Sequence, residues 1–311
     1  MKLQTPVTDQ PCKAGISYKD KILMLGSCFA DSIGTMLCNY GFDAMVNPFG
    51  TLYNPMSILN SVRRLASGEP FTGEECVQMG AGAGLTCSFS HHTSFAREND
   101  EAFLENANRT LAEASAFFRE CNKVIITLGT SWCYRSIAGN MIVSNCLKRP
   151  AAEFVRERMP VKRITECIQE IIGICNSPEG DGPESDTSGS KAQEGIIRKD
   201  IILTVSPIRH LADGAHGNQV SKASLLLGIE DAISGTGQAD YFPSYEIFMD
   251  ELRDYRFYDE DMCHPTRQAE GYILERFLGW ALPSSEHAIL EQNIRSFRHS
   301  RHIPMTYSRN K

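Results

Sequence analysis

Two stretches near opposite ends of the chain carry residue types that could together perform nucleophilic catalysis. Ser27 follows the apolar run 22–25 and Gly26, at the point where helical spacing begins. Near the C-terminus, "DEDMCHP" places Asp261 three residues before His264. A histidine can take the proton from a serine hydroxyl, and a carboxylate can fix the imidazole tautomer and stabilise the imidazolium. These residues predict a catalytic triad with Ser27 as nucleophile, His264 as base and Asp261 as its partner.

Each stretch taken alone also has a simpler explanation. Serine is a common N-cap residue at the start of a helix, and an acid at this offset is unsurprising within the cluster 259–261. Cys28 and Cys263 flank the predicted catalytic residues, and a thiolate would be a stronger nucleophile than a hydroxyl. We favour Ser27 because it stands in the turn itself, one step before Cys28. The two cysteines and His264 could alternatively bind zinc, which would require a fourth ligand and would occupy the base.

An alternation of strands and helices is needed to position these side chains. Five short β-like runs cover residues 21–25, 42–49, 123–129, 200–207 and 239–244. Helical spacing of apolar residues covers 29–40, 103–118, 164–175 and 269–280. This pattern predicts βαβ units and an α/β fold, a three-layer α/β/α sandwich with a central parallel, flavodoxin-like sheet. Because ligands bind at the carboxyl ends of such strands, we expect one functional rim built from the segments 26–27, 47–50, 129–131 and 206–210.

Composition and charge exclude several classes of function. Of the 311 residues, 31 are basic and 38 are acidic, and the net charge of -7 argues against nucleic acid or an anionic membrane as partner. No apolar run reaches the ~20 residues that span a bilayer, and no signal-peptide pattern begins the chain, so we expect a cytoplasmic protein. The 11 cysteines are scattered and form no Cys-x-x-Cys pair. We therefore expect reduced thiols, no metal site and no cofactor.

Three segments depart from the α/β pattern of what we expect to be a single domain, 1–311. Residues 67–99 lack clear periodicity and are interpreted as an excursion over the core. Residues 176–195 are polar and rich in Gly, Ser and Pro, which predicts a disordered surface insertion. The stretch 295–311 contains the densest group of basic residues and is interpreted as a solvated tail.

The sequence resembles the GSCFA family, which is named for the pentapeptide found here at residues 26–30, and more widely the SGNH/GDSL hydrolase superfamily. Further stretches similar to that family are 47–55, 128–132, 206–222 and 241–265. The resemblance extends from Thr5 to Leu278. It implies an SGNH-type fold and, from the wider superfamily, an esterase acting on acyl or acetyl groups without a cofactor.

The resemblance also implies roles for single positions. Ser27 matches the nucleophile, His264 the base and Asp261 its partner, while Gly50 matches the block-two glycine whose N–H helps to form the oxyanion hole. The superfamily has Gly-x-Asn where this chain has Gly-Thr-Ser at 129–131, so the asparagine donor is missing. A nearby asparagine or arginine could replace it. The expected oxyanion hole comprises Ser27, Gly50, Thr130 and Ser131, with Asn47, Asn54 or Arg209 as possible substitutes.

A dense polar stretch, 206–222, is expected to form a substrate-binding rim in which Arg209 and Lys222 could engage a carboxylate or phosphate. The expected substrate-binding residues are Asn47, Asn54, His92, Arg209, His210 and Asn218. The interpretation that results is a serine hydrolase that cleaves a small-molecule or carbohydrate ester, with a short acyl or acetyl group on a polar carrier. The alternatives are a non-catalytic or weakly catalytic binding module, and a phosphoesterase or acyltransferase that uses the same rim.

Overall fold

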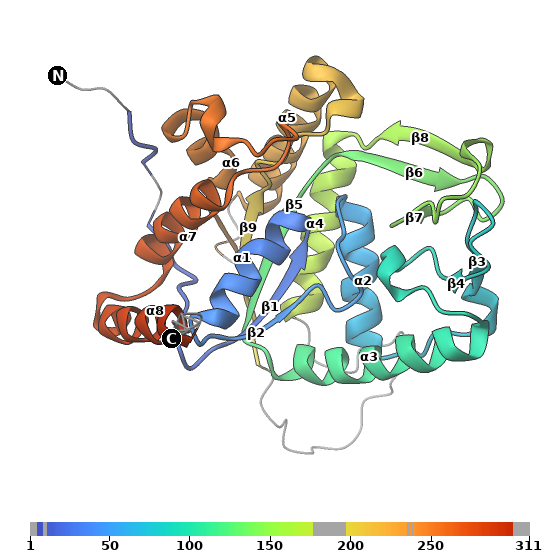
Figure 1. Ribbon diagram of the computed structural model, residues 1–311, viewed down its shortest axis with the longest axis horizontal. Coiled ribbons are helices and arrows are strands. Elements are labelled where there is room, and N and C mark those ends of the chain that lie inside the picture. Colours follow the sequence, from blue (N-terminus) through green and yellow to red (C-terminus); the bar gives the residue numbers. More distant parts are fainter. Residues whose placement is uncertain (1–4, 9–10, 177–196, 235–236, 238, 301–311) are drawn as a thin grey trace, which may run out of the picture.

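The structure is a computed structural model that describes residues 5–8, 11–176, 197–234, 237 and 239–300 (Figure 1). At its centre is a five-stranded sheet in which every neighbouring pair is parallel. In spatial order the strands are β2 (Asp43–Val46), β1 (Lys21–Gly26), β5 (Lys123–Leu128), β9 (Asp200–Val205) and β10 (Ala239–Tyr241). Numbered along the chain, this is the 2-1-3-4-5 order of flavodoxin-like sheets.

Helices cover both faces of this sheet, which explains why its inner strands are almost continuously apolar. Leu23 and Leu25 of β1 belong to a core shared with α2 (Pro55–Ser67), α3 (Asp100–Glu120), α4 (Val161–Asn176) and α5 (Gly214–Ile233). Ile22 and Met24 point the opposite way, into a core shared with α1 (Cys28–Asn39) and α7 (Arg267–Ala281). The predicted three-layer α/β/α architecture is therefore confirmed.

Two small antiparallel sheets lie beyond the parallel sheet (Figure 1). One pairs β3 (Val77–Gln78) with β4 (Thr86–Cys87), inside the segment 67–99. The other has the order β7-β6-β8 and comprises β6 (Trp132–Ser136), β7 (Ile142–Val143) and β8 (Phe154–Arg158). Since β6 begins shortly after β5 ends, this second sheet continues from the carboxyl end of β5 and forms a wall there. β6 (WCYRS) and β8 (FVRER) mix charged and apolar residues, so they lack the apolar run that identifies the buried strands of the parallel sheet.

The five expected strands and four expected helices all correspond to elements of the structure. The remaining elements are α8 (His287–Ser300), the short α6 (Ser244–Glu246), a helical turn over Ile247–Glu251 and 3-10 turns over 73–75, 93–95, 151–153, 211–213, 255–257 and 284–286. The expected insertion at 176–195 lies outside the described residues except for Asn176, which ends α4. The stretch interpreted as a solvated tail begins inside α8, and its residues from 301 onward lie outside the described part.

None of the helices in the described part of the chain combines the length and the apolar character that crossing a bilayer requires.

Candidate active site

The turn from β1 to α1 places Ser27 at the point where the strand order reverses, between β1 and β5. Gly26 has a φ of +147°, and a Cβ at this position would lie 2.2 Å from the carbonyl oxygen of Thr127. Glycine therefore permits the close approach of the two strand ends. Ser27 caps α1, and its Oγ accepts a hydrogen bond from the N–H of Phe29 at 3.3 Å. The hydroxyl thus lies at the positive end of the helix dipole, where a developing negative charge is stabilised.

A cleft of about 690 Å³ brings Ser27 together with Asp261 and His264. The wall opposite them comes from the second sheet and includes Trp132, Tyr134 and Arg156. The other cleft-lining residues are Cys28, Tyr53, Asn54, Thr130, Cys133, Val143, Ser144, Asn145, Cys146, Ile208, Arg209, His210, Leu211, Ala212, Asp213 and Cys263. The structure therefore brings Ser27, from near the start of the chain, together with Asp261 and His264, from near its end, at the carboxyl edge of the parallel sheet.

Asp261 and His264 form a tightly bonded turn. Nδ1 of His264 lies 2.5 Å from Oδ2 of Asp261, and Oδ1 accepts the N–H groups of Cys263 at 2.8 Å and His264 at 2.9 Å. These hydrogen bonds, the backbone N–H of His264 foremost, lower the pKa of Asp261 to about 2. Met262, between them, adopts a φ of +58° that closes the turn. An ionised Asp261 must accept the proton on Nδ1, so Nε2 is the nitrogen of His264 that is free to act as a base.

Backbone hydrogen bonds hold this turn against its neighbours. The N–H of Asp259 donates to the carbonyl of His264 at 2.8 Å, and the N–H of Arg209 donates to the carbonyl of Cys263 at 3.1 Å. The second of these bonds fixes the histidine turn to the loop after β9. Thr266 then caps α7 through the N–H of Ala269. The position of the base is thus set by β9 and α7 together.

Ser27 and His264 lie at different depths in the cleft. Ser27 is 2% exposed, while the side chain of His264 is 47% exposed. Within the described residues, no hydrogen bond joins the serine hydroxyl to the imidazole. The hydroxyl is therefore buried and the imidazole exposed, although both residues line the same cleft.

The turn after β2 lies outside the cleft lining and is bonded to the Gly26 turn that precedes Ser27. The N–H of Gly50 donates to the carbonyl of Asn47 at 2.8 Å, and a Cβ on Gly50 would lie 2.3 Å from Cβ of His92. Asn47 Oδ1 accepts the N–H of Gly26 at 2.8 Å, and its Nδ2 donates to Asp31 at 2.5 Å. Asn47, Gly50 and His92 therefore make structural contacts in place of the substrate and oxyanion contacts that the sequence suggested.

The hydroxyl groups at the Gly-Thr-Ser stretch are also engaged internally. The N–H of Thr130 donates to the carbonyl of Tyr53 at 3.0 Å, and its Oγ1 lies 2.9 Å from Oγ of Ser221. Ser131 is fully buried, and both its N–H and its Oγ donate to Ser221, at 2.8 and 3.1 Å. These contacts tie the end of β5 to α5. Thr130 lines the cleft, whereas Ser131 does not.

Two other groups are better placed to donate a hydrogen bond to an oxyanion. Asn54 caps α2, and its Oδ1 accepts the N–H of Ser57 at 2.9 Å. This fixes the orientation of the amide and leaves Nδ2 as its available donor in the cleft. The N–H of Ser27 donates to Thr127 at 3.3 Å, so the first α1 amide without a hydrogen bond among the described residues is that of Cys28. The Asn-Pro sequence of residues 54–55 was the available signal for a capped helix start here.

The polar stretch after β9 is divided between the cleft and the interior. Arg209 and His210 line the cleft, whereas Asn218 accepts the N–H of His210 at 3.1 Å and does not reach it. Burial, and secondarily the charge of Lys222, lowers the pKa of His210 to about 4, so its imidazole is neutral.

Lys222 is buried behind the cleft. Its Nζ donates to the carbonyl oxygens of Gly129 at 2.6 Å and Ser206 at 2.7 Å, just beyond the ends of β5 and β9. Burial lowers the pKa of Lys222 to about 7. Lys222 therefore joins two strand ends. Of the two residues that the sequence suggested for binding a carboxylate or phosphate, Arg209 lines the cleft and Lys222 does not.

The cysteines that flank the predicted catalytic residues both line the cleft. Sγ of Cys28 lies 3.3 Å from the hydroxyl of Tyr53. Burial first, and then the charge of Asp261, raises the pKa of Cys263, which keeps it in the thiol form. Among the described residues, no group of three or more His, Cys, Asp or Glu side chains is arranged to hold a metal ion.

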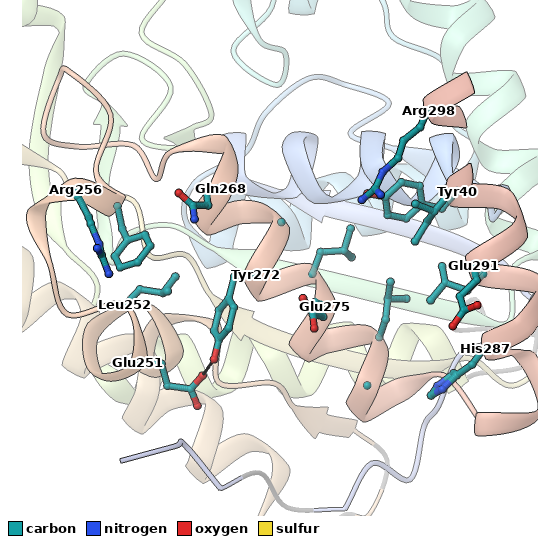
Figure 2. A pocket seen from close by; sticks show the side chains of 17 residues that line it. Tyr40, Glu251, Leu252, Arg256, Gln268, Tyr272, Glu275, His287, Glu291 and Arg298 are labelled. Carbon is teal, nitrogen blue, oxygen red and sulfur yellow. Dashed lines mark hydrogen bonds between the residues drawn. The ribbon is translucent and has the colours of Figure 1, made fainter. Parts of the chain in front are cut away.

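A second and larger hollow of about 900 Å³ lies between α7, α8 and the helical turn at Ile247–Glu251 (Figure 2). Figure 2 shows Tyr272 and Glu251 facing each other within it, and the tyrosine hydroxyl donates to the carboxylate at 2.6 Å. None of the residues that the sequence predicted for catalysis lines this hollow. Because chemistry depends on the side chains present and not on volume, we assign the candidate active site to the smaller cleft.

Fold and site together define an α/β protein whose flavodoxin-like parallel sheet carries a serine, a histidine and an aspartate in one cleft at its switch point. The sequence model described as the GSCFA family matches residues 21–181 and 189–277, and the chain belongs to that family. No curated protein and no solved structure matches the chain.

Proposed function

We propose that this GSCFA protein is a serine hydrolase of the SGNH type that cleaves esters. The observation that carries the proposal is the shared cleft, which is lined by a serine at a helix N-terminus and by a histidine bonded to an ionised aspartate. The hydroxyl of Ser27 needs a base, which His264 would supply. His264 in turn needs a fixed tautomer, which its hydrogen bond to Asp261 provides. The flavodoxin-like strand order is compatible with the SGNH placement.

In the proposed reaction, Oγ of Ser27 attacks the ester carbonyl carbon while Nε2 of His264 takes the hydroxyl proton. Asp261 stabilises the imidazolium through Nδ1. The tetrahedral oxyanion is stabilised by the amide of Cys28 at the start of α1 and by Nδ2 of Asn54. The carbonyl re-forms, the C–O bond to the alcohol breaks, and His264 protonates the leaving oxygen. Water then attacks the acyl-enzyme with His264 again as base, which releases the acid and restores Ser27.

The shape of the cleft supports a small acyl group on a ring-containing polar carrier, such as a carbohydrate. The aromatic side chains of Tyr53, Trp132 and Tyr134 line it, and flat aromatic faces pack well against sugar rings. Its volume of about 690 Å³ is in the usual range for sites that enclose a small molecule.

Hydrolysis of aryl acetates, aryl butyrates and acetylated sugars by the purified protein tests the proposal. Ser27→Ala and His264→Ala should each reduce kcat by at least ~10³-fold. Ser67→Ala and His287→Ala serve as matched controls, since neither residue lines the cleft. Equal activity in Ser27→Ala and the native protein would refute the serine mechanism.

A binding module with little catalysis is a second candidate, and one observation favours it. Ser27 and His264 share no hydrogen bond within the described residues, and the N–H groups of Ser27 and Gly50 are engaged by carbonyls. A cleft that binds sugar acetates, detected as a rise in Tm, without hydrolysing any of them would support this alternative. A phosphoesterase that uses Arg209 in the same rim would act on phosphoesters. An acyltransferase would require an acceptor alcohol.

A further inference from the structure

We infer that Arg209 is the anion-binding residue of this cleft, and that the ester substrate carries a carboxylate or phosphate group that pairs with it. The inference deepens the proposed function, on which it rests, by naming the charge of the substrate. It commits to an anionic ester in which the charged group lies beside the histidine turn.

The charges that line the cleft leave Arg209 without an acidic partner. Four ionised side chains line it, two basic and two acidic. Arg156 forms an ion pair with Asp213, whose side chain is 2% exposed, and Asp261 is bonded to His264. Within the described residues, no carboxylate oxygen lies within 4 Å of the guanidinium of Arg209. Among the described residues that line the cleft, Arg209 is therefore the arginine with no carboxylate within ion-pair distance, so a ligand anion can bind it directly.

Aromatic contacts hold this guanidinium in place, and a side-chain hydrogen bond to Tyr258 engages one of its five N–H donors. Cζ of Arg209 lies 3.8 Å from the ring centroid of Tyr258 and 5.6 Å from that of Tyr255. A guanidinium stacked on an aromatic face keeps its N–H groups in the plane, where they match the two oxygens of a carboxylate. Tyr255 is 69% exposed and does not line the cleft.

The backbone of Arg209 is hydrogen-bonded to the turn that carries His264. Its N–H donates to Cys263, the residue directly before His264, at 3.1 Å. An anion bound by Arg209 is thus held next to the catalytic histidine and not at a remote surface. Other cations do not compete for it, because Lys222 is buried behind the cleft and Arg156 is already paired.

The test compares a neutral ester with esters that carry a carboxylate on the alcohol or on the acyl group. Phenyl acetate is the neutral ester, 4-acetoxybenzoate carries the carboxylate on the alcohol, and the phenyl monoester of succinic acid carries it on the acyl group. Arg209→Gln should raise KM for an anionic ester by ~10–100-fold, with a much smaller change for phenyl acetate. Which of the two anionic esters responds identifies the side of the substrate that bears the charge. For an anionic ester, the KM of Arg209→Lys should lie between those of the native protein and of Arg209→Gln, because lysine keeps the charge and loses the planar fork.

Arg256→Gln is the matched control. This arginine also stacks on an aromatic ring, with Cζ 4.8 Å from the centroid of Phe257, but it lines the second hollow and not the cleft. It should leave KM for every ester unchanged. An equal loss on neutral and anionic esters in Arg209→Gln, or a native preference for phenyl acetate, would overturn the inference.

A binding measurement separates this inference from the proposed function. Succinate, and separately inorganic phosphate, should raise the Tm of the native protein and of Ser27→Ala, but not that of Arg209→Gln. If no ester is hydrolysed and this difference is still seen, the hydrolase proposal fails and the anion site stands. If esters are hydrolysed and neither anion raises the native Tm, the anion site fails and the hydrolase proposal stands.

Discussion

Nδ1 of His264 lies 2.5 Å from Oδ2 of Asp261, and Oδ1 of that carboxylate accepts the histidine's own N–H at 2.9 Å. One carboxylate therefore shapes the turn with one oxygen and orients the imidazole with the other. Nothing else among the described contacts fixes the ring, so the orientation of the base depends on this single side chain.

Asp261→Asn should reduce kcat for ester hydrolysis by ~10²–10⁴-fold, because an amide cannot stabilise the imidazolium. The amide oxygen can still accept the two backbone N–H groups, so the turn should persist. The Tm should change little, since Asp261 is exposed. Steady-state kinetics and thermal unfolding measured on the same sample check both parts. A variant with native kcat would show that Asp261 has no role in the reaction.

Asn54→Ser separates the two roles given to this residue. Serine can still cap α2, but it lacks the amide donor proposed for the oxyanion. We expect kcat to fall by ~10²–10³-fold with an almost unchanged Tm. Asn99→Ser, at the cap of α3 where Asn99 accepts from Ala102 at 2.8 Å, is the control and should keep full activity. If Asn54→Ser is fully active, the donor must come from elsewhere.

Gly50→Ala should destabilise the protein by about 2–5 kcal/mol. The residue has a φ of +82°, and the new Cβ would lie 2.3 Å from Cβ of His92, which cannot move without its backbone. Chemical denaturation gives the free energy of unfolding. Gly73→Ala, where no atom lies within 4 Å of the new Cβ, should cost much less. A stable but inactive Gly50→Ala protein would instead favour the oxyanion role suggested by its sequence position.

Lys222 should make stability depend on pH. Its pKa is about 7 when folded and 10.5 in the unfolded chain, so between these values the unfolded state binds a proton that the folded state does not. The contribution to the free energy of unfolding therefore rises with pH, by ~1.4 kcal/mol per unit at most, and is lost as pH falls toward 7. Urea unfolding of the native protein and Lys222→Met at pH 7.5 and 9.5 measures the difference in slope. Lys21→Met, at an exposed site, is the control. Parallel slopes would show that Lys222 stays charged when folded.

The layers, and the meeting of Ser27, Asp261 and His264 in one cleft, could be predicted from sequence because their signals are local. Apolar runs identify strands such as 123–128, whose residues are all buried, and a three-residue offset identifies the turn between Asp261 and His264. The parallel order of the strands then places both ends of the chain at one rim. No knowledge of side-chain contacts was needed for these steps.

The oxyanion donors and the cleft walls could not be predicted because they depend on contacts distant in sequence. Whether the N–H of Gly50 is available depends on Asn47, and its need to be glycine depends on His92. The sequence predicts that Lys222 is a polar rim residue, but the side chain is buried and its Nζ donates to two carbonyls at the strand ends. The two longer strands of the wall formed by β6, β7 and β8 contain charged residues and show no continuous apolar run.

The most direct test of the central claim is covalent labelling with a fluorophosphonate probe, followed by mass-spectrometric mapping of the modified residue. The account predicts labelling of native protein at Ser27, no labelling of Ser27→Ala, slow labelling of His264→Ala and unchanged labelling of Cys28→Ala. Folded native protein that stays unlabelled, or that is labelled at Cys28 instead, would contradict it.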